Sequence, residues 1–220
     1  MKNKLLTALL GFFAAILIIT ISIGLPIYVR PFYYYQIDAL DIPSYSGADR
    51  ETIIEAYDEL LDYLTVPGNE FSTGDFKYSE SGKSHFVDCK VLFDLNLYAF
   101  IISLVSIAIL LILRRCGVFE LWRPFGMNIL FSTGSFTLGG FALIGALAAT
   151  NFDRAFTIFH KLFFPGKDNW LFSWWEDEII RILPQDFFMN CAILILVSII
   201  TLCVVSIVYS LIEKKIKTSK

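Results

Sequence analysis

The chain has 220 residues, of which 56% are hydrophobic and 16% aromatic, and its mean hydropathy is +0.63. A water-soluble surface is not expected from this composition, so the sequence predicts a membrane protein. The net charge is −3, and the four cysteines form no C-x-x-C motif. Nucleic-acid binding and redox chemistry are therefore not expected.

Four segments contain no Asp, Glu, Lys, Arg or His: residues 5–29, 95–113, 127–149 and 187–212. Each is long enough to cross a hydrocarbon core about 30 Å thick. We therefore expect an all-α integral membrane protein with four transmembrane helices in a single membrane domain, 1–220. Too few residues remain for a second independent soluble domain. The apolar runs also lack the alternation of transmembrane β-strands.

Basic residues concentrate in three short segments. Residues 1–4, 114–126 and 213–220 hold nine of the eighteen Lys and Arg residues in 25 positions. By the positive-inside rule these segments, and with them both termini, are expected in the cytoplasm. The segments 30–94 and 150–186 carry nineteen of the 21 acidic residues. We expect them to form an extracytoplasmic cap of short amphipathic helices and loops.

The first apolar segment has an alternative interpretation as a cleavable signal peptide. Lys2 and Lys4 precede the apolar run, and Ser22 and Gly24 have the small-x-small arrangement of a cleavage site. The run is longer than a typical signal-peptide core, and its removal would conflict with the distribution of basic residues. A retained transmembrane helix is therefore favoured.

The first cap segment contains an amphipathic pattern. Between residues 49 and 64 apolar side chains recur at helical spacing, and acidic residues occupy the opposite side. Ser46 and Asp49 fit a capping box at the start of this helix. Residues 69–82 are predicted to form a loop or a short hairpin. After them, Ser84 is expected to cap a helix that continues into the second span.

Aromatic residues dominate the second cap segment. Four phenylalanines recur at spacings of four, three and four residues: Phe152, Phe156, Phe159 and Phe163. They predict a helix from about residue 150 to 165, capped by Thr150 with Asp153, that lies along the membrane surface or covers an apolar chamber. Ser173 and Glu176 fit another capping box, before a short amphipathic helix that ends near residue 183.

The sequence has two histidines, His85 and His160, and both fall in the cap close to a span. Their matched positions beside aromatic residues favour a shared catalytic site, with Asp88 able to orient His85. A structural role for either histidine remains the alternative. A helix capped by Ser84 would place His85 in its first turn, where the dipole favours a neutral base. His160, near a helix C-terminus, would be the acid.

Other chemistries have weaker support. Ser135 lacks the G-x-S-x-G motif of a serine nucleophile. A zinc site would need a third ligand from Asp88, Cys89 or Asp177, and no H-E-x-x-H motif is present. Haem-binding bundles place histidines within their spans, and no charged group interrupts a span as in ion-coupled transporters. We therefore expect no metal site and no haem.

Several short motifs occur in a specific order along the chain. Residues 84–88 precede the second span; they are followed by 156–164, by 169–172, by Asp177 and by 179–184. In order and spacing these motifs resemble the lipoprotein intramolecular transacylase (Lit) family of Gram-positive bacteria. The resemblance covers nearly the whole chain and departs from the family pattern at the Ser-Trp-Trp sequence that follows the third motif.

The resemblance implies an acyltransferase without a cofactor in the bacterial cell membrane. Its substrate would be a lipoprotein with a diacylglyceryl group on its N-terminal cysteine. The sn-2 acyl chain would move to the α-amine of that cysteine and give a lyso-form lipoprotein. Such a transfer within one molecule needs no acyl-enzyme, which explains the lack of a convincing nucleophile.

With this activity, His85 and His160 are the expected general acid and base, supported by Asp88 and Asp177, on the extracytoplasmic side. The expected substrate pocket consists of Tyr35, Phe156, Phe159, Phe163 and Trp170.

Two other functions stay open. One is a noncatalytic membrane subunit that docks a partner through its aromatic outer surface, and the other is an intermolecular phospholipid acyltransferase.

Overall fold

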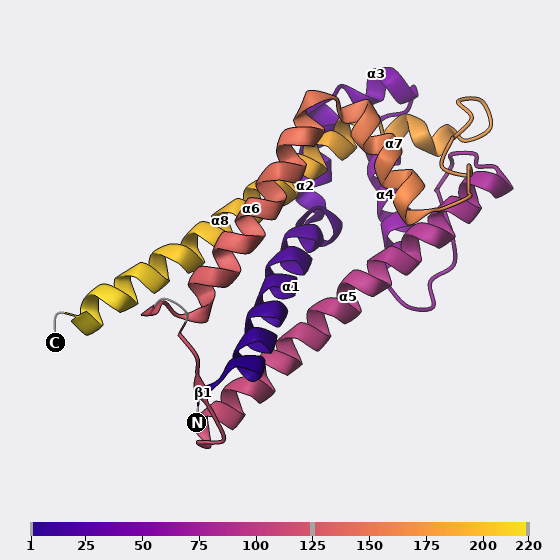
Figure 1. Ribbon diagram of the computed structural model, residues 1–220. Coiled ribbons are helices and arrows are strands. Elements are labelled where there is room, and N and C mark those ends of the chain that lie inside the picture. Colours follow the sequence, from indigo (N-terminus) through magenta and orange to yellow (C-terminus); the bar gives the residue numbers. More distant parts are fainter. Residues whose placement is uncertain (1, 124–125, 219–220) are drawn as a thin grey trace. The chain divides into compact units, whose positions relative to one another are not determined.

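The structure is a computed structural model that describes residues 2–123 and 126–218. Part of the predicted loop 114–126 and the last lysine of the predicted tail lie outside the described residues. The elements follow in this order (Figure 1): β1 (Lys2–Asn3), α1 (Lys4–Tyr28), α2 (Arg30–Ala39), α3 (Ile42–Ser46), α4 (Arg50–Thr65), α5 (Glu80–Arg115), β2 (Glu120–Leu121), α6 (Ile129–Thr150), α7 (Phe152–Phe163), the 3-10 helix η2 (Glu178–Ile182) and α8 (Gln185–Thr218).

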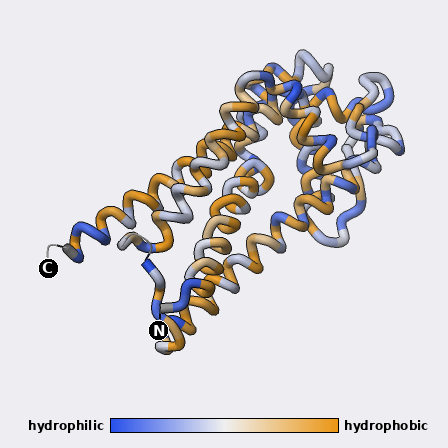
Figure 2. Tube along the Cα trace, viewed as in Figure 1, coloured by the Kyte–Doolittle hydropathy of each residue, from blue (hydrophilic) through white to orange (hydrophobic). Residues whose placement is uncertain are grey.

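Four of these helices, α1, α5, α6 and α8, are long and apolar enough to cross a membrane. Figure 2 shows hydrophobic residues along them and hydrophilic residues at the C-terminal end of α8. The predicted all-α membrane protein with four transmembrane helices is confirmed. At 1.5 Å per residue, the 36 residues of α5 span about 54 Å. Its first turns, residues 80–94, therefore extend beyond the apolar segment 95–113.

The chain divides into two compact units. The first consists of Met1–Ile23, Asn96–Leu147 and Leu194–Lys220, and the second of Gly24–Leu95 and Ala148–Ile193. The first unit contains most of the four apolar helices, and the second contains both predicted cap segments. The interpretation of the whole chain as one membrane domain stays a prediction.

Small residues allow close helix packing in the first unit. The helices α6 and α8 run side by side (Figure 1), and a Cβ on Gly134 would lie 2.9 Å from the backbone oxygen of Cys203. A Cβ on Gly11 of α1 would lie 2.9 Å from side-chain atoms of Ile129 and Thr133 on α6, and the Thr133 hydroxyl donates to the backbone oxygen of Gly11 at 3.3 Å. Such approaches strengthen van der Waals contact between helices that gain little from hydrophobic burial in lipid.

The second unit has its own hydrophobic core. Tyr33, Ile37, Ile53, Ile179 and Ile182 are at most 1% exposed and come from α2, α4 and η2. The Tyr33 hydroxyl donates to the backbone oxygen of Ile182 at 2.7 Å, so this buried polar group is satisfied. The core therefore joins the two cap segments, which are far apart in sequence.

The amphipathic helix predicted at residues 49–64 is α4, and its apolar face forms part of this core. The predicted capping box is wrong. The Asp49 side chain caps α4 by accepting from the backbone N–H of Thr52 at 2.8 Å. Ser46 ends the preceding helix α3, where its hydroxyl donates to the backbone oxygen of Ile42.

Three further expected helix starts differ from the structure. Ser84 lies inside α5, because Ser79 accepts from the backbone N–H of Gly82 at 3.0 Å and caps the helix one turn earlier. For α7, Asn151 is the N-cap and accepts from the N–H of Arg154 at 2.9 Å. The predicted helix after the Ser173 capping box is only the short 3-10 helix η2, which begins at Glu178.

Replacing Ile53 by Ala should destabilise the second unit, because it leaves a cavity at a position with no exposed surface. The expected loss is about 2–5 kcal/mol of unfolding free energy. The control Val66→Ala changes a side chain that is 43% exposed, and its effect should stay within about 0.5 kcal/mol. Thermal unfolding in detergent measures both variants. Equal Tm values for them would contradict this account of the core.

Candidate active site

The imidazole rings of His85 and His160 lie next to each other in the second unit. Their centroids are 5.6 Å apart, with an angle of 34° between the ring planes. His85 is the sixth residue of α5 and 5% exposed, and His160 lies in the last turn of α7 and is 6% exposed. The structure thus brings together the two residues that the sequence analysis selected.

Asp177 determines where α5 begins. Its buried carboxylate accepts from the backbone N–H and the hydroxyl of Ser79, both at 2.7 Å, and from the N–H of Ser173 at 3.0 Å. Gly82 packs against the same carboxylate, and a Cβ at this position would collide with it. Because Ser79 caps α5, Asp177 orients the turns of α5 that carry His85. This contact is consistent with the supporting role expected for Asp177.

Aromatic rings and one backbone carbonyl surround His160. Its ring stacks on Trp170, with centroids 4.7 Å apart, and lies 4.3 Å from the ring of Phe156. The Nδ1–H group donates to the backbone oxygen of Phe156 at 2.8 Å. A carbonyl oxygen only accepts hydrogen bonds, so the neutral ring keeps its lone pair on Nε2. The aromatic faces also favour the imidazolium form through cation–π attraction.

His85 lies in a more apolar environment. The rings of Phe164 and Phe172 lie 4.8 and 5.5 Å from its centroid, and Nε2 is 3.4 Å from the Sγ atom of Cys89. Burial, together with the neighbouring His160, lowers the pKa of His85 to about 4. Burial raises the pKa of the Cys89 thiol to about 12. His85 is therefore neutral and Cys89 protonated at neutral pH.

The predicted first-turn position of His85 is wrong, because α5 begins earlier than expected. A helix dipole acts mainly within the first turn, so it does not explain a neutral His85. Desolvation gives the same protonation state instead. The predicted position of His160 near the end of its helix agrees with the structure, but burial lowers its pKa as well.

Asp88 was expected to orient His85, but its described hydrogen bonds go elsewhere. One carboxylate oxygen pairs with Lys167 Nζ at 2.5 Å, and the other accepts from Asn169 Nδ2 at 2.9 Å. Burial by itself would raise the pKa of Asp88, but these two bonds outweigh it and hold the pKa below its usual value. Asp88 acts on the His85 ring as a nearby negative charge.

The expected pocket residues differ in their positions. Phe156 and Trp170 contact His160 directly. Phe159 meets His160 edge-to-face at 5.4 Å and is 46% exposed, while Phe163 packs on Phe159 and is also 46% exposed. Tyr35 is 70% exposed on α2, and the ring contacts described for the two histidines do not include it.

Sequence reasoning did not select five neighbours of the histidines as supporting or pocket residues: Phe164, Phe172, Cys89, Lys167 and Asn169. Phe164 contacts both imidazoles, and it directly follows the phenylalanine pattern of α7. Lys167 and Asn169 lie in an irregular loop, where no periodicity indicates which way a side chain points. Asn169 belongs to one of the family-like motifs, which was the signal available.

Among residues 2–123 and 126–218, no cluster of three potential metal ligands is found.

These features define a helical integral membrane protein with two buried, adjacent imidazoles outside its apolar segments. The family model for lipoprotein intramolecular transacylase Lit matches residues 8–188, so this chain belongs to the Lit family. The resemblance noted in the sequence is thereby confirmed, and the chain is an acyltransferase of this family. The family assignment selects an enzyme over the noncatalytic alternative.

Solved structures agree with this assignment. The structure of the membrane integral lipoprotein intramolecular transacylase Lit from Bacillus cereus matches with a TM-score of 0.84 and 27% identity, over 98% of this chain and 96% of that one. A structure of the same Bacillus cereus protein with a histidine-to-arginine mutation has a TM-score of 0.80 and 27% identity, over 98% and 94% of the two chains. A comparison with curated protein sequences gives no significant match.

The burial of His85 predicts a specific dependence of stability on pH. Its pKa is about 4 in the folded protein and about 6.5 when unfolded, so the unfolded state binds more protons between these values. Stability should be complete above pH 6.5 and decrease as the pH falls towards 4. The lowered pKa of His160 acts in the same direction.

Thermal unfolding between pH 4 and 8 measures this dependence. The His85→Asn variant should show a smaller decrease of Tm between pH 6.5 and 4 than the unmodified protein. Identical pH profiles for the two proteins would show that His85 does not have the lowered pKa.

Proposed function

We propose that the chain transfers the sn-2 acyl chain of a diacylglyceryl-modified lipoprotein to the α-amine of its N-terminal cysteine, through general acid and base catalysis by His85 and His160. The observation that carries this proposal is the pair of buried imidazoles, 5.6 Å apart, in a member of a transacylase family. The substrate is a lipoprotein in the membrane, and no nucleic acid, metal or cofactor takes part.

The reaction needs one bond formed and one broken. The amine nitrogen attacks the ester carbonyl carbon, and the C–O bond to the glyceryl oxygen then breaks to leave an amide and a free hydroxyl. The amine loses one proton and the glyceryl oxygen gains one, so the reaction has no net proton change. Two positioned imidazoles can accept and return this proton, and each such group contributes roughly 10²- to 10⁴-fold in rate.

The protonation states of the pair suit this task. Both rings are neutral at neutral pH, because burial lowers both pKa values. The proximity of the rings disfavours simultaneous protonation of both. The pair therefore carries a single proton during a turnover. Stacking on Trp170 and Phe156 stabilises the charge on His160 while it does so.

Confinement of the flexible lipid is the second requirement. An amine and an ester held together within one molecule can have an effective molarity of about 10⁵ to 10⁸ M. Phe156, Phe164 and Phe172 surround the imidazoles with apolar rings. Exclusion of water by these rings protects the ester from hydrolysis, which would otherwise compete with the amine.

Replacing either histidine should abolish the transfer. His85→Asn and His160→Asn are each expected to lower the rate by about 10²- to 10⁴-fold, because each removes one proton-transfer group. Mass spectrometry of a defined diacylated lipoprotein, incubated with purified protein, measures N-acylation and loss of the glyceryl acyl chain in the same molecule.

The control is Asn69→Ala, a substitution in an exposed loop that should leave the rate unchanged. Incubation with isotope-labelled phospholipid separates the intramolecular reaction from an intermolecular one. Label in the lipoprotein product would overturn the proposed acyl donor, and full activity of either histidine variant would overturn the two-histidine mechanism.

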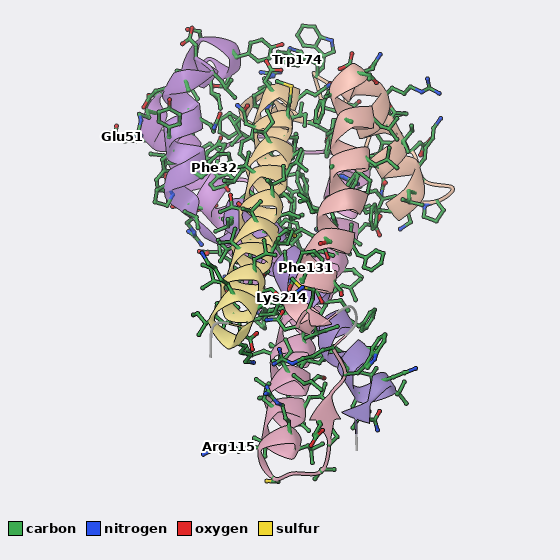
Figure 3. The ribbon with its side chains drawn as sticks, turned by 60° about the vertical axis from the view of Figure 1, so that its left-hand side comes forward. Phe32, Glu51, Arg115, Phe131, Trp174 and Lys214 are labelled. Atoms are coloured by element: carbon green, nitrogen blue, oxygen red, sulfur yellow. The ribbon has the colours of Figure 1, made fainter. Side chains whose placement is uncertain are left out.

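We also propose that the histidine site lies on the extracytoplasmic side of the bacterial cell membrane, with both termini in the cytoplasm. The distribution of basic residues supports this orientation. Cys116 is exposed in the predicted cytoplasmic loop. Glu51 is exposed on α4 in the second unit, and its side chain projects from the helix (Figure 3).

A membrane-impermeant maleimide applied to intact cells tests the orientation. The Glu51→Cys variant, in a Cys116→Ser background, should react from outside. Cys116 itself should react only after the membrane is opened. Labelling of Cys116 in intact cells, with protection of the Glu51→Cys variant, would reverse the orientation.

A further inference from the structure

Asn169 lies against the face of α5 that carries His85. Its Nδ2 group donates to Asp88 at 2.9 Å and to the Ser84 hydroxyl at 3.4 Å. Positions 84, 85 and 88 lie on one side of a helix with 3.6 residues per turn. The carboxamide of Asn169 is therefore held beside the His85 ring by residues on either side of it in the helix.

Asp88 also determines which end of the carboxamide faces it. A carboxylate only accepts hydrogen bonds, so the NH₂ end of Asn169 must point to Asp88. The ion pair between Asp88 and Lys167 keeps the carboxylate charged and strengthens this bond. The oxygen of the carboxamide is consequently directed away from Asp88.

Two buried polar atoms at this place have no hydrogen-bond partner among the described residues. They are Nδ1 of His85 and Oδ1 of Asn169. One of them can carry a hydrogen, the other accepts one, and leaving both unpaired would be costly. Burial lowers the pKa of His85, and the nearby Asn169 side chain opposes this shift, which places its carboxamide close to the ring.

The other ring nitrogen of His85 is consistent with the same pairing. Its Nε2 atom lies 3.4 Å from Sγ of Cys89, which keeps its proton. A protonated thiol can donate to Nε2 when this atom carries the lone pair, so the contact is compatible with a hydrogen on Nδ1. Both sides of the ring are thus consistent with a hydrogen on Nδ1 and a lone pair on Nε2.

We propose that Asn169 is a positioning residue that accepts a hydrogen bond from Nδ1–H of His85 and so holds this ring with its basic nitrogen at Nε2. This deepens the proposed function and rests on it where catalysis is concerned. His160 has the same arrangement, with Phe156 as the acceptor for Nδ1–H. Each imidazole would then present Nε2 for proton transfer, with its ring direction fixed by an acceptor behind it.

The charged and titratable groups around His85 come from three elements. Asp88 and Cys89 lie on α5, His160 on α7, and Lys167 in the loop after α7. Asn169 connects the ring to the Asp88–Lys167 ion pair without placing a charge directly on it. This arrangement orients His85 and leaves it neutral, as a proton acceptor requires.

Nitrogen NMR of protein labelled with ¹⁵N-histidine tests the tautomer, because the chain has only two histidines. Spectra of the His160→Asn variant assign the signals of His85. The unmodified protein should show Nδ1 protonated and Nε2 unprotonated in His85. Asn169→Leu, which keeps the approximate size but removes both the acceptor and the NH₂ donor to Asp88, should shift His85 towards the Nε2–H tautomer. Cys89→Ala should retain the Nδ1–H tautomer.

Activity provides the second measurement. Asn169→Leu should lower kcat by about 10- to 100-fold, as for other outer partners that orient a histidine, with a smaller change in KM. The exposed loop variant Asn69→Leu is the matched control and should change neither the tautomer nor kcat.

The outcomes separate this inference from the proposed function. A protonated Nε2 in the unmodified protein, or an unchanged tautomer in Asn169→Leu, would overturn the role of Asn169 whatever the activity. An unmodified protein that transfers no acyl chain would overturn the proposed function. The NMR result would still decide the role of Asn169.

Discussion

The electrostatic cost of charging two neighbouring buried imidazoles is the main constraint on the histidine site. At a centroid separation of 5.6 Å and with little solvent, the rings resist carrying a charge at the same time. Their neighbours therefore differ in kind. His160 stacks on Trp170, whose π-face can stabilise a cation, whereas Phe164 and Phe172 meet His85 edge-to-face and burial favours its neutral form. This difference supports the proposal that the pair carries one proton during a turnover.

The loop between α7 and η2 supplies aromatic neighbours to both histidines. Phe164 contacts both rings, and Trp170 stacks on His160. The side chain of Asn169 and that of Asp177 hold this loop against α5, through Asp88 and Ser79 respectively. The loop is therefore the common support of two histidines that are carried by different helices.

The predicted amphipathic helix and the candidate site show where pattern reasoning succeeds. Apolar residues at helical spacing predicted α4 within one residue at each end, because burial of one face dominates the stability of such a helix. The predicted capping residues were wrong at α4, α5 and α7. Several Ser, Thr, Asn and Asp residues near each start have similar capping ability, and the tertiary contacts select among them.

The sequence by itself determined the membrane-spanning segments and the family resemblance, and it predicted His85 and His160 as the catalytic pair. Long apolar segments without charged residues are stable in the hydrocarbon core of a membrane. Histidine is the side chain that usually transfers protons near neutral pH, and the sequence has only two. Only the tertiary structure decided that Asp88 bonds to Lys167 and Asn169, and that Asp177 anchors the start of α5. These contacts join residues that are far apart in the sequence, and one partner of each lies in an irregular segment. No periodic pattern there indicates the direction in which a side chain points.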